Sequence, residues 1–239
     1  DDFKIPEDNF GSFHNLPEKI VHREKMLKGE WPGQGCEYCK VIEDAGGFSD
    51  RMHNNDLPGY APTELKDDQT LTNVKPTIVE IFAHNTCNFK CTYCNPTLSS
   101  RIEQESRSFG DHALFSPVND LNNAVVDKRY EDFFVWLEDN IQGLMRLHLL
   151  GGETFIQHDL ITRVLDLVER KPCPNLQLNI FSNFNPPQKY FKKYINAIHE
   201  LWKKGCIGRF DLTASIDCWG PHAEYVRFGL NCTEFEENF

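Results

Sequence analysis

From about residue 76 onward, the sequence alternates between short β-branched segments and longer amphipathic ones, and this alternation limits the folds open to the chain. Apolar, β-branched runs predict strands over residues 78–83, 144–150, 176–181 and 210–216. Apolar side chains at helical spacing predict helices over residues 129–141, 159–170 and 188–204, with Asp159 as an N-cap and Gly205 as a helix end. Strands joined through helices favour a parallel sheet with right-handed crossovers, so we predict an α/β fold.

The first 75 residues have a different character. Residues 17–28 predict one short helix, and the glycines and prolines that follow predict turns and otherwise irregular structure. So few large apolar residues could hardly fold alone, and a metal bound by Cys36 and Cys39 would supply the missing stability. We therefore divide the chain into residues 1–75 and residues 76–239.

A cysteine triplet directly follows the first predicted strand. Cys87, Cys91 and Cys94 stand as Cys-Asn-Phe-Lys-Cys-Thr-Tyr-Cys, and cysteine thiolates are the usual protein ligands of iron–sulfur clusters. Three thiolates leave one iron of a four-iron cluster without a protein ligand, and an open position is typical of a reactive metal centre. Two zinc interpretations compete with this one: a Cys3His site completed by His84, or two triplet cysteines joined to Cys36 and Cys39.

Short motifs also follow the other predicted strands. They are Gly151-Gly152-Glu153 after the second strand, Ser182-Asn183 after the third, and Ser215-Ile216-Asp217 after the fourth, with Arg227 ten residues beyond Asp217. In β/α barrels the chemistry lies at these strand ends. Glycines there let the backbone approach a ligand closely. Each motif also has a plainer interpretation as a turn, and Arg227 as an exposed surface residue.

Taken in this order, the motifs resemble those of the radical S-adenosylmethionine (radical SAM) enzymes. The resemblance covers roughly residues 26–239. It implies a [4Fe–4S] cluster on the triplet, S-adenosylmethionine at the open iron, and a 5′-deoxyadenosyl radical that abstracts hydrogen from a peptide or small-molecule substrate. It also implies an electron from flavodoxin or ferredoxin. The implied cofactor-binding residues are Tyr93, Gly151, Gly152, Glu153, Ser182, Asn183, Ser215, Asp217 and Arg227. Cys218 departs from the family pattern, which has glycine there.

The same resemblance sets expectations for the fold. The family core is a partial (β/α)6 TIM-like barrel, so four predicted strands imply a barrel truncated after strand four. The stretch from Met26 through Cys36 and Cys39 resembles the twitch-type, SPASM-like segment that helps to bind an auxiliary iron–sulfur cluster. No cysteine precedes Cys36, so the other ligands of a second cluster are not identified. A zinc site is an alternative, and so is a redox Cys-x-x-Cys, although we predict no following helix to lower a thiol pKa.

Composition limits the classes of partner that the protein is expected to have. A net charge of −11 argues against nucleic acid as the main partner, and no stretch approaches the roughly 18 apolar residues of a membrane span. An odd count of nine cysteines fits thiolate metal ligation in a reducing cytosol better than a secreted disulfide framework. We therefore expect a cytoplasmic protein. The histidines other than His84, including His148, show no ligand spacing and are interpreted as surface or core residues.

Two further classes stay open. One is a zinc-stabilised binding module, which would bind zinc in a ratio near one to one. The other is an iron–sulfur scaffold or electron-transfer protein that does not cleave S-adenosylmethionine.

Overall fold

The computed structural model describes residues 10–33, 35–56, 72–110 and 123–239. The chain divides into two compact units, residues 1–76 and 77–239. None of the helices in these described ranges combines the length and the apolar composition of a membrane span.

The first unit contains more helix than predicted. Its elements are the 3-10 helix η1 (Phe10–Asn15) and the helices α1 (Pro17–Leu27), α2 (Glu37–Asp44) and α3 (Asp50–Asp56). Only α1 was predicted, so the expectation of one short helix was wrong. Glycines flank α2 closely, and they left a window too short for a helical pattern to stand out. No residue of η1, α1 or α2 is buried, so these helices have little core of their own.

The second unit is built on one parallel sheet with the strand order β1-β3-β4-β5. These strands are β1 (Ile78–Phe82), β3 (Arg146–Leu150), β4 (Cys173–Ser182) and β5 (Ile207–Ala214). Every neighbouring pair is parallel, so the predicted α/β class and parallel sheet are confirmed. Within the described residues the sheet is open, with β1 and β5 at its edges.

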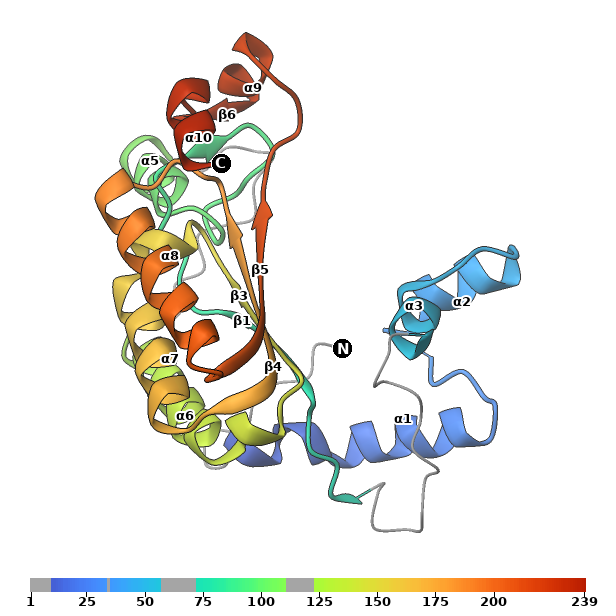
Figure 1. Ribbon diagram of the computed structural model, residues 1–239. Helices are drawn as coiled ribbons and strands as arrows, with labels where there is room; N and C mark the ends of the chain where they lie inside the picture. Colours follow the sequence, from blue (N-terminus) through green and yellow to red (C-terminus); the bar gives the residue numbers. More distant parts are fainter. Residues whose placement is uncertain (1–9, 34, 57–71, 111–122) are drawn as a thin grey trace. The chain divides into compact units, whose positions relative to one another are not determined.

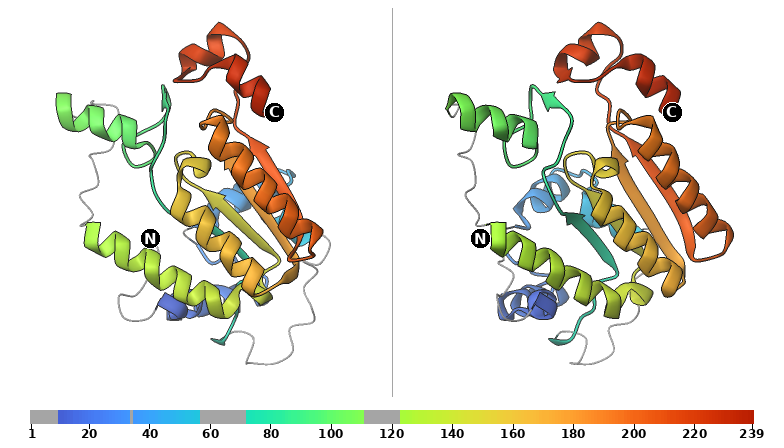
Figure 2. Two further views of the ribbon diagram at one scale, coloured as in Figure 1. Left: turned by 60° about the vertical axis from the view of Figure 1, so that its left-hand side comes forward. Right: turned by 90° about the vertical axis from the view of Figure 1, so that its left-hand side faces the viewer.

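Three helices pack on one face of this sheet (Figures 1 and 2). They are α6 (Asn123–Asn140), α7 (His158–Arg170) and α8 (Gln188–Lys203). Fully buried leucines such as Leu147, Leu149 and Leu178 form the core with the apolar side of α7. Each contributes about 1.5–3 kcal/mol relative to leaving it exposed. The predicted end of α8 is confirmed, because Gly205 follows it in the left-handed region, at a φ of 73°.

The prediction of Asp159 as an N-cap was wrong. The residue that caps α7 is Gln157, and its side chain makes no capping hydrogen bond. Asp159 lies in the first turn, where its Oδ2 accepts a hydrogen bond from the Tyr130 hydroxyl at 2.9 Å. A carboxylate in the first turn still favours the positive end of the helix dipole, which explains why the sequence signal resembled a cap.

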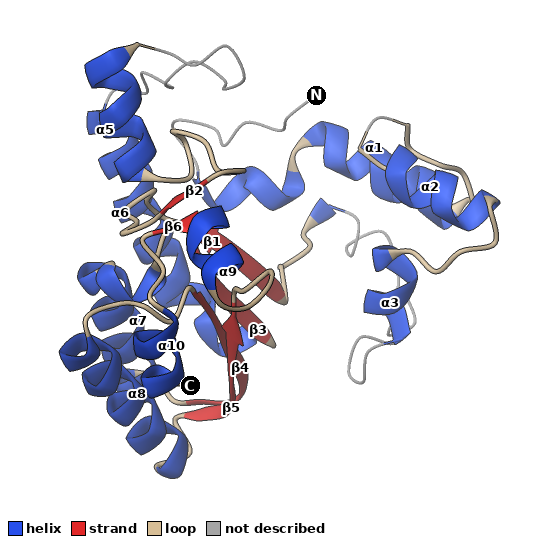
Figure 3. Ribbon diagram, turned by 90° about the horizontal axis from the view of Figure 1, so that it is seen from above, coloured by secondary structure: helices blue, strands red, loops and turns tan. Residues whose placement is uncertain are grey.

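Short elements lie over the carboxyl ends of the strands, as Figure 3 shows from above. They are β2 (Lys90–Cys91), α9 (Pro221–Val226), β6 (Arg227–Phe228) and α10 (Cys232–Asn238). The strands β2 and β6 form a two-stranded antiparallel sheet, which the sequence did not predict because two-residue strands have no periodicity. The helix α5 (Ser100–Phe109) follows the cysteine triplet and was not predicted.

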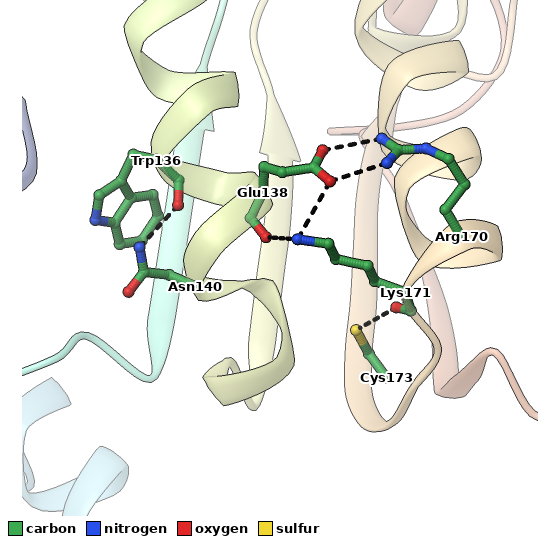
Figure 4. Close-up of polar contacts among 6 residues, drawn as sticks. All are labelled: Trp136, Glu138, Asn140, Arg170, Lys171 and Cys173. Atoms are coloured by element: carbon green, nitrogen blue, oxygen red, sulfur yellow. Dashed lines mark hydrogen bonds and ion pairs between the residues drawn. The ribbon is translucent and has the colours of Figure 1, made fainter.

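Ion pairs join α6 to the end of α7 on the outer surface. The Arg170 guanidinium donates two hydrogen bonds of 2.9 Å to Glu138, and Lys171 donates to the Glu138 backbone oxygen at 2.7 Å (Figure 4). Hydrogen bonds from Arg170 and then Lys171 lower the pKa of Glu138 to about 2. Pairs this exposed add little stability, so we infer that they mainly set the register of the two helices.

The remaining 3-10 helices are η2 (Ile141–Gly143) and η3 (Thr154–Ile156).

Candidate functional site

The cysteine triplet lies in the loop that leaves the carboxyl end of β1. The ring of Phe89 anchors this loop in the core and is only 1% exposed. The Ser99 hydroxyl donates to the Phe89 backbone oxygen at 2.7 Å, and the Cys87 N–H donates to the Ser100 hydroxyl at 3.1 Å. Ser99 also caps α5. The start of that helix therefore fixes the backbone around the cysteines.

All three thiols of the triplet are half-buried. Burial raises the pKa of Cys87 to about 11, despite a hydrogen bond from the Phe89 N–H, and nearby Glu153 and the two other thiols add to the rise. Burial also raises the pKa of Cys91 and of Cys94, while the Arg227 guanidinium opposes both shifts. These interactions place the three sulfurs and one cation in the same neighbourhood. Without a metal, the thiols are held in their protonated form.

Whether these side chains suit a metal depends on the kind of metal. Within the described ranges, no three His, Cys, Asp or Glu side chains are arranged to hold a metal ion. A single zinc ion needs all its ligands within about 2.0–2.3 Å of one point. The cysteines of an iron–sulfur cluster ligate different irons, so their sulfurs need not converge in that way. The donor set of three half-buried thiols beside a guanidinium fits the charge and ligand chemistry of such a cluster.

Gly151 and Gly152 lie where the cysteine loop crosses the end of β3. A Cβ atom on Gly151 would lie 2.7 Å from the His84 backbone oxygen, and one on Gly152 would lie 2.0 Å from the Thr86 backbone oxygen. Gly151 also has a φ of 108°, which side chains other than glycine rarely adopt. The sequence interpretation was that these glycines let the backbone approach a ligand closely. In the structure, the atoms that approach them are backbone oxygens of the cysteine loop.

Glu153 is the most deeply buried charged side chain of the site, with 0% exposure. Its carboxylate accepts hydrogen bonds from the Ser182 hydroxyl at 2.9 Å and from the backbone N–H groups of Asn183 at 2.6 Å and Phe155 at 3.0 Å. Burial raises the pKa of Glu153 to about 7, although these hydrogen bonds favour the charged form. Its oxygens therefore join the end of β3 to the turn after β4.

Ser182 and Asn183 carry this connection on to the cysteine loop. The Asn183 Nδ2 donates to the Asn88 Oδ1 at 2.8 Å, and the Asn88 Nδ2 donates to the Asn185 backbone oxygen at 2.8 Å. Asn88 is the residue directly after Cys87, so the triplet is connected through it to the turn after β4.

The asparagine connections extend to the start of α10. Asn185 and Asn231 exchange two hydrogen bonds, because the Asn185 Nδ2 donates to the Asn231 backbone oxygen at 3.1 Å and the Asn231 N–H donates to the Asn185 Oδ1 at 2.6 Å. Our sequence reasoning missed Asn88, Asn185 and Asn231. The only available signal was the repeat of Asn in Asn183-Phe184-Asn185, which also fits an ordinary turn.

Three residues from distant parts of the sequence lie close together: Tyr93, Asp217 and Arg227. The first and the last are 134 positions apart in the sequence. The Tyr93 hydroxyl donates to the Asp217 Oδ2 at 2.8 Å, and the Arg227 Nε donates to the same oxygen at 2.6 Å. The Arg227 guanidinium carbon lies 5.6 Å from the centre of the Tyr93 ring. Pairing of β2 with β6, together with a 2.8 Å bond from the Thr92 N–H to the Val226 oxygen, brings these residues together.

Ser215 and Cys218 lie on the segment between β5 and α9. The Ser215 N–H donates to the Ser182 backbone oxygen at 2.8 Å, which aligns the ends of β4 and β5. Cys218, where the family pattern has glycine, is exposed. Gly220 has a φ of 70° two residues later.

Cys36 and Cys39 belong to the first unit. Cys36 is the N-cap of α2, and Cys39 lies in its first turn, so the two are three residues apart on the same side of a helix. The expectation that no helix follows this Cys-x-x-Cys was wrong. Arg51 interacts electrostatically with both cysteines and forms an ion pair with Glu43. The first unit contains no third cysteine.

Comparisons with known proteins found no relative of this chain. No protein-family model, no curated protein and no solved structure matches the chain.

Proposed function

We propose that the protein is a radical SAM enzyme in which Cys87, Cys91 and Cys94 ligate a [4Fe–4S] cluster. The observation that carries this proposal is the position of three half-buried, mutually interacting thiols at the carboxyl end of β1. Motif residues from the ends of β3, β4 and β5 lie around the same loop through the contacts of Gly152, Glu153 and Ser182. Chemistry at this end of a parallel sheet is general for β/α folds.

A bound cluster would supply an electron to S-adenosylmethionine and so generate the 5′-deoxyadenosyl radical that abstracts hydrogen from the substrate. The protein's own residues would bind and orient. The Arg227 guanidinium would offset thiolate charge near Cys91 and Cys94. Its Nε bonds to Asp217, which leaves its terminal N–H groups to bind a carboxylate such as that of methionine.

In this proposal Glu153 acts mainly as a positioning residue. Both of its oxygens already accept hydrogen bonds from the protein, so its carboxylate would hold the glycine turn and the turn after β4 in register. Tyr93 is 58% exposed beside Arg227, and its ring would offer a face to the adenine. The part of the cofactor site near the ribose would be formed by Ser182, Asn183 and Ser215.

The proposed fold is a partial TIM-like barrel, to which the four parallel strands of the described residues belong. Sequential strand order with helices on a single face is the arrangement from which a β/α barrel is built. A twitch-like role for Cys36 and Cys39, with an auxiliary cluster, belongs to the same proposal. So do the reductant protein, flavodoxin or ferredoxin, and a cytoplasmic location.

The test is anaerobic reconstitution of the whole chain with iron and sulfide, followed by S-adenosylmethionine and dithionite. We expect about four irons per chain, or about eight if Cys36 and Cys39 help to bind a second cluster, together with 5′-deoxyadenosine. The triple variant C87S/C91S/C94S should lose about four irons and all 5′-deoxyadenosine formation. The matched control C218S, which changes an exposed cysteine, should keep both.

Other outcomes would overturn the proposal. Zinc bound in place of iron would favour the zinc-stabilised module. Iron bound without 5′-deoxyadenosine would favour the scaffold or electron-transfer protein.

A further inference from the structure

The backbone is strained at one position in the turn after β4. Phe184 has a φ of 58°, and it is the one residue other than glycine with a positive φ in the described ranges. A bulky side chain in this left-handed region lies too close to its own backbone, so the conformation is unfavourable. Such strain persists only where the surrounding structure holds the residue in place. The contacts of Phe184 therefore indicate what the turn does.

The turn at Phe184 directs polar groups on both sides of it toward the cysteine loop. The Phe184 N–H donates to the Ser182 hydroxyl at 3.0 Å. The Asn185 N–H donates to the Asn183 Oδ1 at 2.9 Å, and the Asn183 Nδ2 then donates to the Asn88 Oδ1. The backbone oxygen of Asn185 accepts from the Asn88 Nδ2. One asparagine side chain thus meets a donor and an acceptor from the two residues that flank Phe184.

The strained residue is held by its ring and by its backbone. The Phe184 ring is 4% exposed, and its centre lies 5.4 Å from that of Phe191 in α8 and 5.3 Å from that of Phe235 in α10. Aromatic rings at these separations attract one another in addition to burying apolar area. The Phe184 backbone oxygen accepts a hydrogen bond from the Asn238 Nδ2 of α10 at 2.9 Å. Helix α10, which lies over the carboxyl ends of the strands (Figure 3), therefore contacts both parts of this residue.

Asn88 connects the strained turn to the first cysteine of the triplet. Both polar atoms of its side chain are bonded to the turn, at 2.8 Å each, and Asn88 directly follows Cys87. Cys91 lies in β2, which pairs with β6, and the Cys94 N–H donates to the Cys91 backbone oxygen at 3.0 Å. Among the described residues, no hydrogen bond joins residues 91–94 to the turn after β4. The turn therefore affects Cys87 more directly than the other two cysteines.

We propose that Phe184 is a positioning residue for Cys87. Its left-handed turn, held by α8 and α10, fixes Asn88 and thereby fixes the backbone at Cys87 in the absence of metal. A glycine would adopt the same φ without strain, but it would lose the ring that joins the turn to the two helices. The effect on the loop of the metal-free chain does not depend on cluster chemistry. Only its consequence for ligation of a cluster rests on the proposed function.

The test is the rate at which iodoacetamide alkylates each cysteine of the whole metal-free chain at one fixed pH, followed by mass spectrometry. The ratio of the Cys87 rate to the Cys94 rate measures local opening, because both thiols are half-buried and Cys94 has no hydrogen bond to the turn. Cys173 is 3% exposed, so its rate reports global unfolding. We expect the ratio to rise about tenfold or more in F184A, which keeps a Cβ in the left-handed region and loses the ring.

F184G separates the strained turn from ordinary packing. Glycine removes more of the side chain than alanine does, but it adopts a φ of 58° without strain. The alkylation ratio should therefore be at least about threefold lower in F184G than in F184A. A residue that acts by packing alone would give the opposite order, since glycine leaves the larger cavity and the more flexible backbone. The matched control F191A removes a ring of the same cluster that is 5% exposed, and it should leave the ratio near that of wild type.

A second pair of variants tests the proposal without loss of an aromatic ring, and so also serves if F184A does not fold. N238A removes the hydrogen bond to the Phe184 oxygen and should raise the ratio about twofold or more. E236A changes an exposed residue of the same helix and should leave it unchanged. An unchanged ratio in the folded variants, a higher ratio in F184G than in F184A, or an equal rise in F191A would overturn the proposal. Because these measurements need neither iron nor S-adenosylmethionine, they can fail while the radical SAM proposal stands, and the reverse.

Discussion

The chain contains two close-spaced cysteine groups, and the structure supports them very differently. The loop that holds Cys87, Cys91 and Cys94 contacts the ends of β3 and β4. Its short strand β2 also pairs with β6. Cys36 caps an eight-residue helix with no buried residue, and Cys39 lies in the first turn of that helix. Spacing alone predicted ligands in both places. A cysteine pattern therefore forms a preorganised metal site only where other elements fix its backbone in the absence of metal.

The two groups should also depend on metal to different extents. A site fixed by packing can exist before the metal binds, whereas a site without a core gains its order from the metal. We therefore expect the triplet loop to be ordered in the metal-free chain, and α2 to gain stability only on metal binding.

Hydrogen exchange should show the largest difference between the two regions. In the metal-free chain, we expect amides of β3 and β4 to open only with global unfolding, and those of α1 and α2, which have no buried residue, to open locally. We expect protection at least ~1,000-fold higher in the strands. If Cys36 and Cys39 bind a cluster, reconstitution should raise the protection of α2, and C36S/C39S should abolish that gain. Equal protection of α2 and β4 would refute the contrast.

Substitution of Gly152 should be the most damaging single change at the triplet. A Cβ there would lie 2.0 Å from the Thr86 oxygen, which is backbone and cannot move aside cheaply. We expect G152A to destabilise the metal-free chain by at least ~3 kcal/mol in urea unfolding. The control G205A meets no atom within 4 Å and has a φ of 73°, so it should cost only ~1–2 kcal/mol of backbone strain. Similar losses of stability in the two variants would show that the cysteine loop shifts to make room for the added methyl group.

The sequence predicted the large elements because their patterns are long. Helix α8, with its apolar residues at helical spacing and Gly205 at its end, could be placed almost to the residue. The motif residues also fell at strand ends as expected, because parallel strands joined by helices leave no other place for their loops.

Other parts of the site could not be predicted because they depend on contacts distant in sequence. The pairing of β2 with β6 joins two-residue strands, and the meeting of Asn88 with Asn183 is a tertiary contact between polar residues that also suit turns. Likewise, the position of the His148 Nε2, buried and without a hydrogen-bond partner among the described residues, follows from strand register and burial. Nothing in its spacing along the chain indicated it.

The buried carboxyl of Glu153 should make the stability of the metal-free chain depend on pH. Its pKa is raised from 4.5 to about 7, so between these values the folded chain keeps a proton that the unfolded chain has lost. This contribution to stability is therefore present below about pH 4.5 and is lost as pH rises to about 7. The loss should amount to about 3 kcal/mol at most.

Urea unfolding across pH 4–8 measures this effect as the difference between wild type and E153Q. The variant cannot titrate at this position, so its stability should fall less over that range. S182A is the control, because it removes one hydrogen bond to Glu153 and leaves the carboxyl able to titrate. Parallel curves for wild type and E153Q would mean that Glu153 is already ionised in the fold.

The smallest expected effect is at Tyr93, and it separates local order from stability. Y93F removes the hydroxyl that donates to Asp217 at 2.8 Å, and the control Y130F removes a similar 2.9 Å bond to Asp159 on the outer surface. Each should cost less than about 1 kcal/mol, because both pairs are exposed. Only Y93F should loosen the segment that holds Cys91, since Tyr93 and Arg227 share the Asp217 oxygen. Alkylation of Cys91 by iodoacetamide, followed by mass spectrometry, should therefore become faster in Y93F alone. Equal rates in the two variants would mean that β2 and β6 hold the loop without this contact.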